Sequence, residues 1–121
     1  MAEQYQADDQ YAPGTVVSFG GDFEVTASTT DNDSSVAGVI STNPSFLMNG
    51  ALSGVNVVSL ALTGRVPCRV TGNVRKGNLM VSNGDGTARA EVNPAPGAVI
   101  GKAIENFDGG VGVIEVVVGR L

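Results

Sequence analysis

The apolar residues of this chain occur in short runs, and almost every run ends at a glycine, a proline or an Asn–Asp cluster. The 121 residues include 17 glycines and 5 prolines. The clearest runs are VVSLALT at residues 57–63 and VGVIEVVV at residues 111–118. Runs of about four to eight residues fit strands, whereas a helix needs about ten or more. We therefore predict an all-β fold, a small barrel or sandwich of roughly eight to ten short strands.

Turn residues separate the predicted strands, and the N-terminal residues stand apart from them. Residues 1–12 are polar and end at the turn Pro13-Gly14, so we expect a polar N-terminal arm or linker. Residues 13–121 then form a single β domain, because a chain of this size buries about two-thirds of its surface on folding. Strands are predicted at residues 15–19, 23–28, 36–41, 57–63, 65–71, 79–81 and 111–121, turns at 76–78, 83–86 and 94–97, a strand or one helical turn at 98–105, and a short helical turn or isolated strand at 46–48.

Basic residues are absent from the first half of the sequence and then arrive close together, as Arg65, Arg69, Arg75 and Lys76. Apolar residues alternate with the first two arginines, which places both arginines on one solvated face of a strand. Nucleic-acid sites combine basic grooves with stacking aromatic rings, and this stretch has no aromatic residue. We expect the four bases to form a solvated strand face and a turn, or contacts between chains, and we expect no nucleic-acid partner.

The net charge of −5 conceals an uneven distribution. The first 64 residues carry seven acids and no base, a charge of −7, and the remaining residues carry seven bases and five acids, a charge of +2. Two interpretations remain open. The charges mark two faces or ends of one barrel, or the acidic part of one copy meets the basic part of another. An acidic chain does not favour anionic membranes, and no apolar run approaches the ~20 residues that span a bilayer, so we expect no membrane insertion.

The chain has no histidine and one cysteine, Cys68. A Ser–His–Asp triad or a Cys–His dyad therefore cannot be built from this chain alone. Cys68 alternates with valines and is expected to be a small buried residue. Asp31, Asp33 and Asp85 offer oxygen ligands of the kind that calcium prefers, but they lie in sequences typical of loops and hairpin tips and lack the twelve-residue calcium pattern. We expect no metal and no cofactor, and we favour a structural role over an enzymatic one.

Several motifs, taken together, resemble a known group of phage proteins. They are A-E-x-Y from residue 2, Y-x-P-G-T-V-V-x-F-G-G from residue 11, V-A-G-V-I-S-T-N-P from residue 36, A-L-T-G-R-V-P-C-R-V-x-G-x-V-x-K-G-x-L from residue 61, I-G-K-A-I-E from residue 100 and I-E-V-V-V-G-R from residue 114. This series resembles the C-terminal domain of tail-fibre-like structural proteins of tailed bacteriophages, especially T4-like phages of marine cyanobacteria. It is also distantly similar to the phage intramolecular-chaperone autoproteolytic cleavage domain of neck-appendage proteins.

The resemblance implies a β-rich domain at the end of a trimeric virion appendage, assembled in the host cytoplasm. There the domain acts as a trimerisation module or an intramolecular chaperone that aligns and folds the fibre. Its expected partners are two further copies of itself and other virion proteins. Arg65, Arg69, Arg75 and Lys76 are then candidate contacts between chains.

The resemblance leaves two alternatives. In the autoproteolytic relatives a glutamate is catalytic, and the matching position here is Glu3, although the scissile Ser-Asp pair has no match in this sequence. The first alternative is therefore a self-cleaving processing domain, in which Glu3 is the catalytic carboxylate and not simply a solvated acid. The second alternative is a head-decoration or host-attachment module that binds a surface glycan.

Overall fold

The computed structural model describes residues 2–41 and 56–119, which contain ten strands and no helix. The strands are β1 (Ala2–Ala7), β2 (Val16–Phe19), β3 (Val25–Ala27), β4 (Val36–Val39), β5 (Asn56–Ala61), β6 (Gly64–Thr71), β7 (Leu79–Ser82), β8 (Ala88–Ala90), β9 (Gly101–Ala103) and β10 (Val111–Val118). The all-β prediction is confirmed. The element predicted at residues 46–48 lies outside the described residues. No described residue belongs to a helix that is long and apolar enough to cross a membrane.

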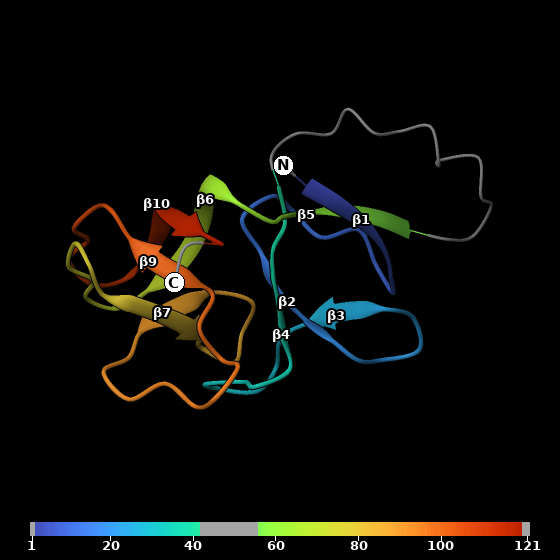
Figure 1. The fold of residues 1–121 in the computed structure, drawn as a ribbon, viewed down its shortest axis with the longest axis horizontal. Helices are drawn as coiled ribbons and strands as arrows, with labels where there is room; N and C mark the ends of the chain where they lie inside the picture. The colour runs from blue at the N-terminus through green and yellow to red at the C-terminus, as the bar shows by residue number, and fades with distance from the viewer. Residues whose placement is uncertain (1, 42–55, 120–121) are drawn as a thin grey trace.

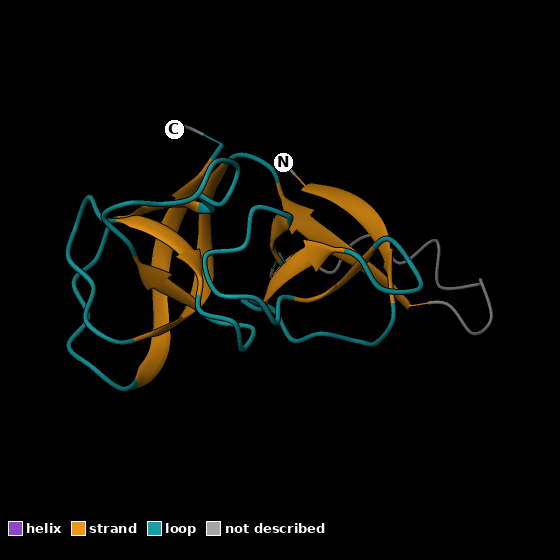
Figure 2. Ribbon diagram, turned by 90° about the horizontal axis from the view of Figure 1, so that it is seen from below, coloured by secondary structure: helices purple, strands orange, loops and turns teal. Residues whose placement is uncertain are grey.

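The strands form two five-stranded sheets that lie next to each other as two lobes (Figure 1). The first sheet has the order β4-β2-β3-β1-β5, and the second closes into a barrel with the order β10-β6-β8-β7-β9. The same two lobes remain distinct when the molecule is turned (Figure 2). We call strands β1–β5 the first half of the molecule and strands β6–β10 the second half.

Period-two alternation correctly predicted β6, one of the two eight-residue strands of the second half. β6 pairs antiparallel with β10 along its whole length, from Gly64↔Val118 to Thr71↔Val111. The apolar residues at positions 66, 68 and 70 are buried, whereas Arg65 and Arg69 are exposed. The turn at residues 83–86 connects β7 to β8. The segment 98–105, for which the sequence allowed a strand or one helical turn, contains the strand β9.

Pro67 lies inside β6. Because proline has no backbone N–H to donate, it fits in a strand only where no neighbouring strand needs a hydrogen bond from that position. The backbone N–H of Arg69, two residues later, points away from β10 and donates to the carbonyl of Gly14 at 2.9 Å. Pro67 has the same orientation in the ladder, so its missing N–H also faces away from β10. On that side β6 pairs with β8 only at Val70↔Ala88, and Pro67 lies beyond this pairing.

The N-terminal residues differ from the expected arm. Residues 2–7 form β1, which pairs antiparallel with β5 over six residue pairs, from Ala2↔Ala61 to Ala7↔Asn56. Ala7 also pairs with Val25 of β3, so β1 is an internal strand of the first sheet. The strand was missed because it is mostly polar and partly exposed on both faces, which leaves no apolar alternation to mark it. The strand conformation of β1 is stabilised by its hydrogen-bonded pairing with β5.

The second half repeats the topology of the first half, a feature that the sequence analysis did not detect. The strand order of the first half, β4-β2-β3-β1-β5, becomes that of the second when each strand number is raised by five. The register is conserved as well, with a shift of 63 positions. The corresponding pairs are Ala7↔Val25 and Val70↔Ala88, Val17↔Ala27 and Met80↔Ala90, and Val16↔Val39 and Leu79↔Lys102.

The last strands of the two halves, β5 and β10, correspond with a shift other than 63 positions. The reason is that the connections before β5 and β10 differ in length. Tyr5↔Val58 in the first half corresponds to Cys68↔Ile114 in the second, so β10 follows β5 by 56 positions. The bridge Ile40↔Leu60 occupies the place of the pair Ala103↔Val116, which closes the second barrel. Among the described residues, β9 and β10 pair at three positions to close the second barrel, whereas the equivalent part of the first half has the bridge Ile40↔Leu60.

A shared hydrogen bond supports the same correspondence. The backbone N–H of Gly14 donates to the carbonyl of Ile40 at 2.9 Å, and that of Gly77 donates to the carbonyl of Ala103 at 2.8 Å. Both glycines have a φ of +89°, a left-handed conformation that favours glycine. The two halves therefore have the same turn before their second strand.

Each half has a hydrophobic cluster, and the cluster of the second half also includes residues of the first half. The cluster of the first half includes Val17, Val25 and Leu60. Val16 and Val39 also belong to strands of the first half, but both are fully buried in the cluster of the second half. Side chains from the first sheet thus complete the hydrophobic cluster of the second barrel.

Candidate interaction site

The four bases singled out in the sequence lie at different places in the second half. Arg65 and Arg69 are on the outer face of β6, Arg75 lies in the loop between β6 and β7, and Lys76 begins the turn before β7. All four are exposed. They do not converge on one point, so the structure does not form an anion-binding cluster from them.

Arg65 belongs to a mixed basic and apolar row that crosses three strands. Val117 of β10 pairs with Arg65 on one side and with Lys102 of β9 on the other. Arg65 and Lys102 are exposed, and Val117 is half-buried between them. Within residues 2–41 and 56–119, no acid forms an ion pair with either base. The row is therefore an apolar strip flanked by free positive charges.

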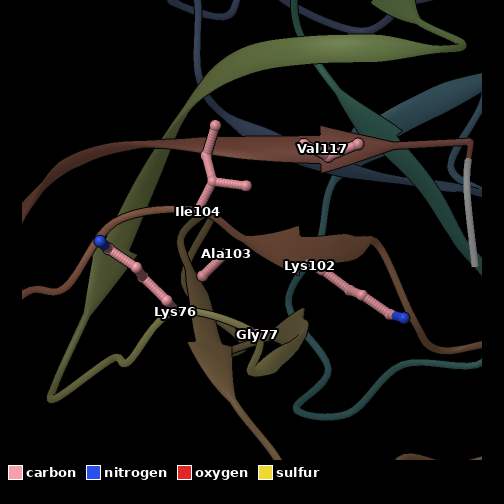
Figure 3. Close-up of a pocket in the computed structure, with 6 residues that line it drawn as sticks. All are labelled: Lys76, Gly77, Lys102, Ala103, Ile104 and Val117. Carbon is pink, nitrogen blue, oxygen red and sulfur yellow. The ribbon is translucent and has the colours of Figure 1, made fainter.

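Lys76 borders an open pocket at the end of this row (Figure 3). The pocket has a volume of about 520 Å³, within the range of small-molecule sites. The side chains of Lys76 and Lys102 extend to opposite sides of it, so the two ammonium groups do not share a ligand position. The lining residues are Lys76, Gly77, Lys102, Ala103, Ile104 and Val117. This apolar floor between two cations suits a protein surface better than a small anion.

Arg69 lies at the junction between the two halves. Its N–H donates to the carbonyl of Gly14 at 2.9 Å. A Cβ placed on Gly14 would lie 3.1 Å from the Cγ of Arg69, so the arginine stem covers this glycine. The backbone and Cγ of Arg69 thus contact Gly14 within the chain, although the residue as a whole is exposed.

Arg75 has partners within its own chain. Its guanidinium forms an ion pair with Asp108 at 2.6 Å and donates to the backbone carbonyls of Val74 and Phe107 at 2.8 and 3.2 Å. Val74 and Phe107 also form an isolated β-bridge. Arg75 therefore fastens two loops of the second barrel together, a role that could not be read from its spacing in the sequence.

Glu3, the carboxylate suggested by the autoproteolytic relatives, is an exposed residue of β1 that pairs with Leu60 of β5. It accepts a hydrogen bond from the hydroxyl of Tyr5 at 2.7 Å. This bond, with partial burial and the nearby charge of Glu24, raises the pKa of Tyr5. The catalytic role of Glu3 stays a prediction.

The loop carboxylates that resembled calcium ligands are engaged in hydrogen bonds. Burial raises the pKa of Asp33, but bonds from Ser18 and Ser28 and from the backbone N–H of Ser35 outweigh it, so that this pKa is lowered overall. The hydroxyl of Thr87 donates to Asp85 at 2.6 Å and lowers its pKa. Within the part of the chain that the structure describes, no group of three or more acidic or thiol side chains is arranged to hold a metal.

Cys68 is fully buried, as the alternation predicted. Burial raises the pKa of its thiol to about 12. A neutral, inaccessible thiol is neither a nucleophile nor a metal ligand. Cys68 acts as a small apolar residue of the second barrel's cluster.

Two aromatic residues of the first half are exposed at the surface. Phe19 is 50% exposed at the end of β2, and Phe23 is 42% exposed in the turn before β3. The ring of Phe19 meets the edge of Tyr5, with 5.6 Å between ring centroids. The strand predicted at residues 23–28 begins only at Val25, so Phe23 lies in the turn before it. Large apolar side chains gathered on a surface indicate an interaction site.

Comparisons with known proteins bear on the fold. No protein-family model matches the sequence, and no curated protein matches it. The head fibre gp8.5 N base of bacteriophage phi29 has a similar solved structure, with a TM-score of 0.60 and 17% sequence identity. The match covers 99% of this chain and 94% of the phage protein. The chain thus shares the fold of this phage head fibre base over nearly its whole length.

Proposed function

We propose that the chain is a structural protein of a phage virion, one that forms a surface fibre or head decoration as a homotrimer and binds other virion proteins. The observation that carries this proposal is the likeness to the phi29 head fibre base over 99% of this chain. The motif resemblance to tail-fibre-like proteins points to the same class of protein. The two are independent, because one rests on sequence blocks and the other on backbone geometry.

The surface of the molecule supports a role in assembly. Two exposed phenylalanines, Phe19 and Phe23, lie on the acidic first half. The apolar strip at Val117 lies between the free bases Arg65 and Lys102 on the second half. Apolar patches rimmed by charge of opposite sign on two parts of one chain suit contacts between copies. A trimer with cyclic symmetry uses such unlike patches, each meeting a different patch on its neighbour.

The proposal is tested on particles released from cells that carry the gene. Virions purified by density gradient are analysed by mass spectrometry and labelled with gold-conjugated antibody against this chain. The expected result is the chain in the particle fraction, with label on the head or its fibres. Recovery of the chain only from the soluble fraction of the lysate would overturn the virion assignment.

A further inference from the structure

The two halves of the chain have the same fold but contact each other through different surfaces. The first half contributes the backbone of Gly14, Val16 and Ser28, and the second half contributes Arg69 and Gly86. Arg69 donates to Gly14 at 2.9 Å, Val16 donates to Gly86 at 2.9 Å, and Gly86 donates to Ser28 at 3.2 Å. We call the first-half side of this junction the socket surface and the second-half side the plug surface.

The socket surface also exists on the second half, where nothing in the described chain covers it. On the first half Val16, Ser28 and Val39 are fully buried beneath the second half. Their counterparts 63 positions later are all at least partly exposed: Leu79, Glu91 and Lys102. The same backbone positions are therefore buried in one half and accessible in the other.

The pocket between the two lysines belongs to this free socket. Its lining residues occupy the positions that, in the first half, are held by residues 13, 14, 39, 40, 41 and 61. Of these, Val39 and Ala61 pack against the hydrophobic cluster of the second half. The pocket therefore lies where a second plug surface would dock.

The plug surface likewise has a free counterpart, on the first half. Ser82 is fully buried and Gly86 is buried at the junction, and Ser82 forms a buried hydrogen bond with Ser28 at 2.8 Å. The residues at the corresponding positions are the exposed Phe19 and Phe23. Where the buried plug has Ser82 and Gly86, the free plug has two phenylalanines. Large apolar side chains at these positions suit an apolar pocket.

We propose that the free plug of one copy, with Phe19 and Phe23, docks on the free socket of a second copy, at the pocket between Lys76 and Lys102. The contact between copies then repeats the contact between the two halves of each chain. Both surfaces are built for burial, because the same fold buries them once already within the chain.

Charge complementarity supports a second copy as the partner. Asp22 and Glu24 lie on either side of Phe23 in the sequence and are exposed. Lys76 and Lys102 extend on either side of the pocket. Docking would bring carboxylates toward ammonium groups at the rim and phenylalanines toward the apolar floor, the usual arrangement of a polar rim around an apolar centre.

The contact is head-to-tail, because plug and socket are different surfaces. Such contacts close into a ring or continue as a filament, depending on the rotation between copies. The proposal names an interface for the homotrimer described above, but it does not depend on the number of copies. An assembly with another copy number would contradict the trimer and leave this interface standing.

Two variants with one damaged surface each test the interface. The plug variant carries Phe19→Ser and Phe23→Ser, and the socket variant carries Lys76→Glu and Lys102→Glu. All four side chains are exposed, so both variants should fold, as circular dichroism would verify. The control is Val113→Ser, which removes an equally exposed apolar side chain outside both surfaces. Association constants are measured by sedimentation equilibrium.

The expected result is a loss of at least about tenfold in self-association for each damaged variant, and no change for Val113→Ser. An equimolar mixture of the plug and socket variants should form one-to-one dimers, because it still contains one intact plug and one intact socket. The proposal is overturned if either variant assembles as the wild type does, if the mixture stays monomeric, or if the wild type does not associate. It is also overturned if the plug variant assembles normally but loses binding to a host glycan.

Discussion

Arg89 binds Asp31 through two hydrogen bonds, from Nε to Oδ1 at 2.7 Å and from Nη2 to Oδ2 at 2.8 Å. Arg89 belongs to β8 and Asp31 to the loop before β4, so this pair joins the two halves of the chain. Asp31 also forms a backbone bridge with Asn83. A planar guanidinium facing both carboxylate oxygens fixes geometry as well as charge. The pair therefore helps to hold one lobe against the other.

The Arg89–Asp31 pair makes stability depend on acid pH. The hydrogen bonds from Arg89 lower the pKa of Asp31 below the ordinary value of an aspartate. A carboxyl with a lowered folded-state pKa contributes stability that is present above the unfolded pKa and is lost as pH falls through the folded one. Asp31→Asn should lower the thermal midpoint at pH 7 and flatten its dependence on pH below about 4.

The control for this prediction is Glu115→Gln, because the carboxylate of Glu115 has no partner among the described residues and lies outside the proposed contact between copies. Thermal unfolding of both variants is followed by circular dichroism at pH 7 and at lower pH. The role of the pair is refuted if Asp31→Asn melts at the wild-type temperature at pH 7.

Substitutions of Cys68 should separate its apolar role from its chemistry. Cys68→Val keeps the site apolar and nearly conserves volume, so it should cost less than about 1.5 kcal/mol. Cys68→Ser buries a hydroxyl in an apolar cluster and should cost about 1–3 kcal/mol. Urea unfolding measures both costs. A thiol reagent should label the wild type only after unfolding, and rapid labelling of the native protein would contradict the account.

The two halves should unfold together. Val39 belongs to the first half but is fully buried in the cluster of the second half. Val39→Ala should therefore lower the stability of the whole chain by about 1–3 kcal/mol in a single transition. The control is Val113→Thr, an exposed position of β10 outside both contact surfaces, which should change stability by less than about 0.5 kcal/mol.

Calorimetry decides this point. A ratio of calorimetric to van't Hoff enthalpy near one is the mark of two-state unfolding, and we expect it for the wild type and for both variants. Two separate transitions, of which Val39→Ala shifts only one, would show that the halves are independent domains.

The sequence predicted the fold where local pattern and local structure agree. The alternation around Cys68 gave the strand β6 because its two faces differ in burial. β1 was missed because both of its faces are partly exposed and its order comes from β5, which is distant in the sequence. Hydrophobic periodicity is a property of one segment, so it cannot predict a strand that forms because it pairs with a second, distant segment.

The internal repeat was equally hidden, although the sequence contains a faint signal. Between positions 14 and 41, the residues that are identical to the residue 63 positions later are Gly14 and Gly77, Gly21 and Gly84, Asp22 and Asp85, Ala27 and Ala90, Val36 and Val99, and Gly38 and Gly101. Both glycines of the pairs 14/77 and 21/84 have a positive φ, between +74° and +89°. Backbone conformation has preserved them while the apolar side chains exchanged freely. The free plug and socket surfaces could be recognised only once the repeat was visible.

Salt should weaken self-association if the rim charges contribute. Asp22 and Glu24 on the plug face Lys76 and Lys102 on the socket in the proposed contact, and exposed charges of this kind are screened. Raising the ionic strength from about 0.1 M to about 1 M shortens the Debye length from about 10 Å to about 3 Å. We expect the association constant to fall over this range, measured by sedimentation. An association constant that does not change would leave apolar packing as the only attraction.

The most direct test of the whole account is the mass of the purified chain in solution, measured by light scattering coupled to size-exclusion chromatography. The account predicts an assembly of three times the 12.2 kDa chain mass, which dissociates on dilution. A monomer of 12.2 kDa at every concentration reached would contradict the claim that this protein works by binding copies of itself.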